Sequence, residues 1–153
     1  MMPTFETSTD RSKEDAAAAR LGEYWRGDII TSTKYMHHDR QLIENGQRKA
    51  IAEIKCRTYS INYFIEHDYM ISAIKVARLQ TSAGLHRIVP LIMVSCSDDD
   101  FLLDLRDETY RIETRRVNDR ATTHAGVVMR DEAMCFFRES RFIPISAINS
   151  LIS

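Results

Sequence analysis

The sequence predicts an α/β protein whose mixed central sheet is flanked by helices, and three observations predict it. Asn45-Gly46 joins two stretches rich in strand-forming residues, and both positions tolerate the positive φ that a two-residue hairpin needs. Residues 88–95 form a nearly all-apolar run, which is typical of a central strand buried on both faces. Helix-forming stretches precede the hairpin and separate it from the apolar run. This order indicates a sheet with helices packed against it.

Length and composition indicate a single soluble domain. The chain has 153 residues, 44% of them hydrophobic and 28% charged, and a chain of this length can bury a core without covalent staples. The formal net charge of −1 argues against a protein that coats nucleic acid by bulk charge, although a catalytic cleft needs only local positive charge. The three cysteines have no metal-ligand spacing and suit a reducing compartment. With no secretion signal and no apolar run of membrane-spanning length, we expect a cytoplasmic protein without a membrane partner.

The first helix is expected from about Asp10 to Trp25, after Ser and Thr residues that can cap its N-terminus. Glu14 precedes the apolar stripe of this helix by three and four residues, so its side chain should face the core. Glu23 should face solvent instead. The apolar stripe comprises Ala17, Ala18, Leu21 and Trp25.

Three strands are expected next, and the third matters most. They span Asp28–Lys34, His38–Glu44 and Lys49–Arg57. Side chains alternate along a strand, so the third strand should have one core face and one face that carries charge. The core face would comprise Ala50, Ala52, Ile54 and Cys56, and the other face Ile51, Glu53, Lys55 and Arg57.

The remainder of the chain gives weaker local signals. A second helix is expected over Asp68–Ser82, with Gly84 as its C-terminal stop. A strand is expected at Arg87–Cys96, and a solvated turn at residues 97–100 leads to the next strand at Phe101–Leu105. Short strands are expected at Gly126–Met129 and Phe142–Ile145. Residues 106–120 are charged and give no clear prediction, and residues 106–153 stay unassigned as an extension. No linker divides the chain, so residues 1–153 are expected to form one domain.

The residues that suggest chemistry are concentrated around the hairpin. Asp39 is followed fourteen residues later by Glu53-Ile54-Lys55, and the hairpin would bring the two carboxylates and the lysine together. Such a set can bind a divalent metal and cut a phosphodiester. Without Asp39 and the hairpin, Glu53 and Lys55 would be interpreted as an ordinary ion pair on a solvated sheet face.

These residues and the order of elements over residues 9–97 resemble the PD-(D/E)xK nuclease superfamily. The tract from Tyr35 to Arg57, with Tyr63-Phe64 and Lys75 after it, is similar to small phage-encoded, Holliday-junction-resolvase-like members. His38 stands where a proline often precedes the aspartate. The resemblance implies a restriction-endonuclease-like αβββαβ core.

The resemblance also implies an activity, namely divalent-metal-dependent hydrolysis of DNA phosphodiester bonds by an endonuclease. Mg²⁺ would be the ion, with Mn²⁺ able to substitute. Asp39 and Glu53 would be direct ligands together with the backbone carbonyl of Ile54, and Glu14 would bind through a water or support a second metal. Lys55 would orient the attacking water and stabilise charge on the phosphate.

The substrate side of the resemblance rests on basic residues. Lys75 and Arg78 lie one turn apart on the second helix and would contact a phosphate, while Arg57 and Arg40 beside the hairpin are candidates for further phosphate contacts. The implied partner is DNA, double-stranded or branched, and junction cleavage would require a homodimer. A phage-encoded protein would act in the host cell cytoplasm.

Alternative interpretations of the same residues stay open. Glu14 would also be favoured by the helix dipole alone, and Lys75 with Arg78 would also suit a solvated helix edge. The alternative function is a non-catalytic nuclease-fold binding module acting through protein or nucleic-acid contacts, and a third is a phage structural or host-takeover protein. Four aromatic residues could either stack on unpaired bases or pack against the sheet, namely Tyr59, Tyr63, Phe64 and Tyr69.

Overall fold

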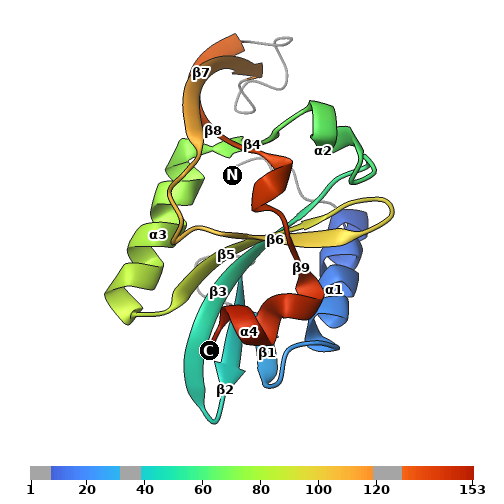
Figure 1. Cartoon of the computed structure of the whole chain (residues 1–153), viewed down its shortest axis with the longest axis vertical. Helices are drawn as coiled ribbons and strands as arrows, with labels where there is room; N and C mark the ends of the chain where they lie inside the picture. Colours follow the sequence, from blue (N-terminus) through green and yellow to red (C-terminus); the bar gives the residue numbers. More distant parts are fainter. Residues whose placement is uncertain (1–7, 32–38, 119–128) are drawn as a thin grey trace.

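The computed structural model describes residues 8–31, 39–118 and 129–153 (Figure 1). Within these ranges the elements are α1 (Ser8–Gly22), β1 (Asp28–Thr31), β2 (Arg40–Glu44), β3 (Gln47–Cys56), α2 (Tyr63–Glu66), β4 (Tyr69–Ser72), α3 (Ala73–His86), β5 (Val89–Ser95), β6 (Asp100–Asp104), β7 (Arg111–Asn118), β8 (Met129–Phe137), η2 (Glu139–Arg141), β9 (Ile143–Pro144), η3 (Ile145–Ala147) and α4 (Ile148–Leu151). None of the helices in these ranges is long and apolar enough to cross a membrane.

The main sheet confirms the predicted α/β class. Its strand order is β1-β2-β3-β5-β6-β9, and β3 pairs with β5 in parallel while the other neighbours are antiparallel. All seven residues of β5 are buried, as predicted for a central strand. A parallel β3–β5 pair needs a crossover between its strands, and α3 lies in that crossover.

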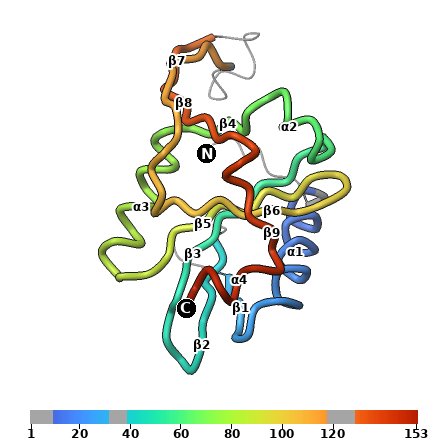
Figure 2. Tube along the Cα trace, in the orientation of Figure 1, coloured from blue at the N-terminus to red at the C-terminus, as the bar shows by residue number. Residues whose placement is uncertain are grey.

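Helices cover both faces of this sheet because side chains of β5 alternate between two cores. Leu91 and Met93 pack with α1 and with residues of the C-terminal η3 and α4, whereas Ile92 and Val94 pack with α3. Figure 1 shows α1 and α3 on different sides of the central strands. The C-terminal segment closes the first core, and Figure 2 shows α4 beside the turn that precedes β1. Arg26 ties the two together by donating its amide to Asn149 Oδ1 at 3.0 Å.

The predicted hairpin is confirmed, with Asn45 at φ 52° and Gly46 at φ 75°. Glycine tolerates this region because it has no Cβ, and asparagine is the next most tolerant residue. The turn starts β3, whose Ala50, Ala52 and Ile54 are buried against α1 as the alternation predicts. Ile51 packs in the opposite core, on the face that carries Glu53 and Lys55.

The helix predicted over Asp68–Ser82 is wrong at both ends. Residues Tyr69–Ser72 form strand β4, whose Tyr69 and Ile71 point into the core and whose backbone pairs with β8. The helix starts at Ala73 and continues through Gly84 to His86. Arg87 ends it with φ 56°, so the left-handed C-cap position is filled by an arginine rather than by the predicted glycine.

A second sheet combines β4, which was predicted as helix, with two strands from the part of the chain that had no clear assignment. Its order is β4-β8-β7, and β7 lies in the charged stretch 106–120. Of the strand predicted at residues 126–129, only Met129 lies within the described residues, and it starts the much longer β8. The short strand predicted at 142–145 is present as β9. β4 and β8 contribute Tyr69, Ile71, Cys135 and Phe137 to the same core as α3, whereas Ile143 of β9 packs on the α1 core.

The predicted solvated turn at residues 97–100 is corrected at its last position. Asp100 belongs to β6 and is buried, with 7% of its surface exposed. Arg20 on α1 reaches it with two hydrogen bonds of 2.7 and 3.0 Å and also donates to Ser95 Oγ at 2.7 Å. The buried carboxylate is therefore paired with a counter-ion. This ion pair attaches α1 to the β5–β6 edge.

Arg20→Ala is expected to lower the free energy of unfolding by about 2 kcal/mol, because it leaves Asp100 charged and unpaired inside the fold. The loss should be smaller than for a fully buried pair, since 43% of the Arg20 side chain is exposed. Urea unfolding followed by circular dichroism measures it. Arg116→Ala is the control, because Arg116 and Asp131 form an exposed pair at 3.5 Å, and it should cost less than about 0.5 kcal/mol. Equal losses in the two variants would contradict the argument.

Candidate active site

The candidate site lies where α3 crosses the charged face of β3. Glu53 and Lys55 are on the same face of β3, and their backbone partners on β5 are Ile92 and Val94. Lys75 is the third residue of α3, which starts directly after β4. Ile92 and Val94 are buried against α3, so the helix brings Lys75 to the charged end of this face of β3.

Glu53 is the centre of a compact ion cluster. Its Oε1 atom lies 3.0 Å from Lys55 Nζ and 2.9 Å from Lys75 Nζ. The Glu53 side chain is only 15% exposed, while those of Lys55 and Lys75 are 25% and 38% exposed. One carboxylate oxygen is therefore shared by two ammonium groups in a partly buried position.

The pKa shifts of the cluster follow from burial and from these contacts. Burial by itself would raise the pKa of Glu53, but the charges and hydrogen bonds of Lys55 and Lys75 outweigh it and hold the pKa below its usual value. Burial lowers the pKa of Lys55, and the neighbouring charge of Lys75 lowers it further. Burial alone would lower the pKa of Lys75 too, but its contacts with Lys55 and Glu53 and the charge of Asp39 raise it. Of the two lysines, Lys55 is the one whose proton is held less tightly.

Asp39 lies immediately before β2, at the end of the strand pair that holds Glu53. Arg40 pairs with Ala52, so the residue before Arg40 lies at the level of the residue after Ala52, which is Glu53. The contribution of Asp39 to the pKa of Lys75 also places its charge close to the cluster. The strand pairing thus brings together the residues that the motif predicts.

Tyr69 extends the site beyond the predicted set through its contact with the predicted Arg57. Tyr69 on β4 is fully buried, and its hydroxyl lies 3.4 Å from Arg57 Nη2. Burial raises the pKa of Tyr69, the positive charge of Arg57 opposes this, and the negative charge of Glu53 adds to it. Tyr69 was not predicted as a neighbour of the site because its segment was expected to be helical.

The remaining predicted site residues lie at different distances from this cluster. Glu14 is partly buried on α1, and it adds to the rise in the pKa of Cys56 that burial causes. Cys56 packs with the α1 core, so Glu14 lies on the face of β3 opposite Lys55. Ile54 has no donor atom in its side chain, which is buried in the core, so only its backbone carbonyl could be a ligand. Arg78 is exposed on α3, one turn beyond Lys75.

Arg40 is buried and contacts α1, as a residue that stabilises the fold would. It is 4% exposed, and its Nη2 atom donates to Asp15 Oδ1 on α1 at 2.6 Å. A guanidinium so covered attaches β2 to α1 and offers little surface to a phosphate. The sequence could not reveal this, because Asp15 and Arg40 are brought together only by the packing of α1 on the sheet.

The oxygen donors at the cluster suit a divalent metal in kind. Among the described residues no group of three His, Cys, Asp or Glu side chains lies close enough to hold an ion. Two carboxylates and a backbone carbonyl nevertheless supply the oxygen donors that Mg²⁺ prefers, with water for its other positions. The two ammonium groups on Glu53 show that this position attracts positive charge. The chemistry of the donors therefore fits an ion that keeps several of its waters.

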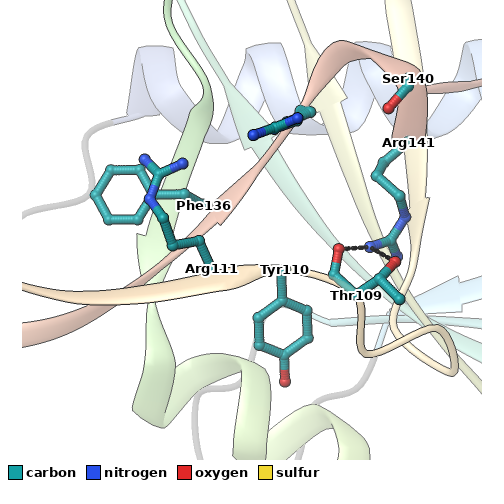
Figure 3. Close-up of a pocket in the computed structure, with 7 residues that line it drawn as sticks. Thr109, Tyr110, Arg111, Phe136, Ser140 and Arg141 are labelled. Atoms are coloured by element: carbon teal, nitrogen blue, oxygen red, sulfur yellow. Dashed lines mark hydrogen bonds between the residues drawn. The ribbon is translucent and has the colours of Figure 1, made fainter.

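A separate shallow pocket of about 360 Å³ lies at the base of the second sheet (Figure 3). Its lining comprises Thr109, Tyr110, Arg111, Phe136, Arg138, Ser140 and Arg141. Arg141 is occupied there with backbone oxygens, donating to Thr109 O at 2.6 Å and Asp107 O at 2.8 Å. Arg111 pairs with Asp68 at 3.0 Å. None of the predicted site residues lines this pocket, so it is distinct from the ion cluster.

Lys75→Met tests the electrostatics of the cluster. It removes one of two cations that oppose protonation of Glu53, so the pKa of Glu53 should rise. In the native protein this pKa lies below its ordinary value of 4.5, so the carboxylate's contribution to stability is complete above that pH and is lost as pH falls through the folded-state pKa. Carboxyl ¹³C NMR titration without metal measures the shift. Arg78→Met should leave Glu53 unchanged, and an unchanged Glu53 in Lys75→Met would contradict the assignment.

Comparison with known proteins agrees with this fold. The structure is similar to that of Archaeoglobus fulgidus Hjc, a Holliday junction resolvase from an archaeal hyperthermophile, with a TM-score of 0.53 and 12% sequence identity over 89% of this chain and 99% of that one. This likeness confirms the predicted restriction-endonuclease-like fold. No curated protein sequence matches significantly. Residues 1–145 match the family model described as "Phage putative PDDEXK endonuclease". The chain therefore belongs to this family of phage endonucleases.

Proposed function

We propose that this nuclease is a divalent-metal-dependent DNA endonuclease whose reaction is centred on Asp39, Glu53 and Lys55. The observation that carries the proposal is the shared contact of Glu53 Oε1 with two lysines, at 3.0 and 2.9 Å. A partly buried carboxylate held by two cations adds little to stability, because apolar residues of the same size would stabilise the fold at least as well. Binding of a charged substrate would account for a carboxylate of this kind at this position.

Asp39, Glu53 and the carbonyl of Ile54 would hold the metal, with Glu14 as a second-metal or water-mediated ligand. When bound, a Mg²⁺ or Mn²⁺ ion neutralises phosphate charge and makes a bound water more acidic. The placement of Glu14 near Cys56, on the α1 side of β3, makes a direct role weaker than that of Asp39.

The basic residues would position the phosphate and the water. Lys55 would orient the attacking water and stabilise charge on the phosphate, and burial holds its pKa below the ordinary value. Lys75 and Arg78 lie on one side of α3, and Arg57 stands at the end of β3, so all three can contact phosphates around the cut. Arg40 would act only by holding β2 in place.

The substrate is proposed to be double-stranded or branched DNA. The relative with the same fold is a Holliday junction resolvase, which supports a branched substrate without specifying it. Paired cuts at a junction would need two sites, and therefore a homodimer. A non-catalytic binding module remains the alternative, and loss of metal binding would favour it.

Cleavage of a DNA panel tests the proposal directly. Linear duplex, single strand, flap and four-way junction are incubated with Mg²⁺, Mn²⁺ or EDTA. Asp39→Ala and the Glu53→Ala, Lys55→Ala double variant should each lose at least about 100-fold in rate while thermal unfolding shows that they stay folded. Glu23→Ala, which removes an exposed acid at the end of α1, should keep full activity. Cutting that survives in EDTA or in the double variant would reject the mechanism.

Lys75 gives a second test, whose readout is binding rather than activity. The Lys75 ammonium contacts the carboxylate that a metal must bind, so it competes with the metal. Lys75→Met should therefore bind Mn²⁺ several-fold more tightly in an electron paramagnetic resonance titration. The same variant should cleave DNA more slowly, because it loses a phosphate contact. Arg78→Met is the matched control and should change cleavage alone. Weaker Mn²⁺ binding in Lys75→Met would show that Lys75 positions the carboxylates instead.

A further inference from the structure

The four aromatic residues that follow β3 divide into a buried pair and an exposed pair. Phe64 and Tyr69 are 4% and 1% exposed and belong to the core under α3. Tyr59 and Tyr63 are 46% and 38% exposed. Of the two outcomes open to these residues, packing in the core therefore holds for the first pair only.

The exposed pair forms the start of a row of stacked rings. The ring centroids of Tyr59 and Tyr63 are 4.1 Å apart with planes 10° from parallel. The His67 ring continues the row, 4.3 Å from Tyr63 and tilted by 44°. Tyr59 stands at the end of this row and is its most exposed tyrosine.

The row is held in place by the core beneath it and by the neighbouring turn. Phe64 meets both tyrosines edge to face, at 5.3 Å from Tyr63 and 6.4 Å from Tyr59. The amide of Ser97 donates to Tyr59 O at 2.8 Å, and the amide of Ile61 donates to Asp98 Oδ1 at 2.9 Å. Figure 1 shows α2 beside the turn between β5 and β6 that supplies these contacts. Rings fixed in this way lose little freedom when a ligand stacks on them.

The row is also continuous with the candidate active site. Phe64 contacts Tyr69 at 5.8 Å between ring centroids, and the Tyr69 hydroxyl lies 3.4 Å from Arg57 Nη2. The charge of Glu53 acts on the same hydroxyl. Arg57 therefore lies against the same buried tyrosine that links the row to the candidate site, and it offers a cation for the phosphate of a nucleotide stacked on the row.

We propose that Tyr59, Tyr63 and His67 form a stacking platform that binds an unpaired base of the DNA strand next to the cleavage site. This inference rests on the proposed nuclease function and adds a substrate class to it. Stacking accepts any base, because each base has a π face, so the platform selects for the unpaired state and not for sequence. A flap or a gap, which carries unpaired bases, would then bind better than a continuous duplex.

The test measures binding in EDTA, where no metal-dependent cleavage can occur. Fluorescence anisotropy compares the full-length protein on a duplex with a single-stranded flap and on the same duplex without it. Tyr59→Leu keeps an apolar side chain but removes the ring, and it should weaken flap binding about tenfold while leaving duplex binding unchanged. Tyr59→Trp should retain flap binding. In the native complex, 2-aminopurine placed at the unpaired position should be quenched, and Tyr59→Leu should restore its emission.

The control is Tyr24→Leu, because Tyr24 is 45% exposed but follows α1 and lies outside the row. It should bind both substrates like the native protein. The platform would be overturned if Tyr59→Leu lost affinity equally for flap and duplex, or if the native complex showed no quenching. It would also be overturned if Tyr59 bound a protein ligand and flap binding did not depend on Tyr59. Cleavage that depends on Glu53 would still support the nuclease in that case. Flap binding that depends on Tyr59 without metal-dependent cleavage would support the platform and reject the nuclease proposal.

Discussion

The parallel pairing of β3 with β5 is the constraint on which the rest of the structure depends. Ala52 lies opposite Leu91 and Glu53 opposite Ile92, and β5 is buried along its whole length. The register therefore decides which side chains of β3 face α1 and which face α3. A shift of one residue would turn Glu53 and Lys55 toward the α1 core and remove Lys75 from their reach.

The charges that meet at this pairing are balanced without a metal. Two carboxylates, Asp39 and Glu53, stand against two ammonium groups, Lys55 and Lys75. A divalent cation added to this set would leave an excess of positive charge, and a phosphate diester would reduce it. Metal and substrate would then each increase the affinity for the other, because each offsets the electrostatic cost of binding its partner. The balance also explains how the cluster is tolerated in a partly buried position.

Local signals in the sequence were sufficient for some features and insufficient for others. The Asn45-Gly46 turn and the alternation of β3 are read from neighbouring residues, and both are present as predicted. The segment 69–72 was predicted as helix, because its strand conformation depends on pairing with β8 more than sixty positions later. The same error hid Tyr69 from the site. The direct contact of Lys75 with Glu53 could not be predicted either, since it requires the true start of α3 and its packing angle.

The charge of the whole molecule limits how such a nuclease can select its substrate. With a formal net charge of −1, the chain has little general attraction for DNA. Positive groups such as Lys75, Arg78 and Arg57 act locally, and contacts to phosphates position a strand without distinguishing one sequence from another. Selection would then depend on what the strand meets beside the carboxylates, where Tyr59 and Tyr63 offer an exposed, ordered aromatic surface. Weak affinity for duplex combined with a surface for unpaired bases would direct cleavage toward interruptions in the duplex.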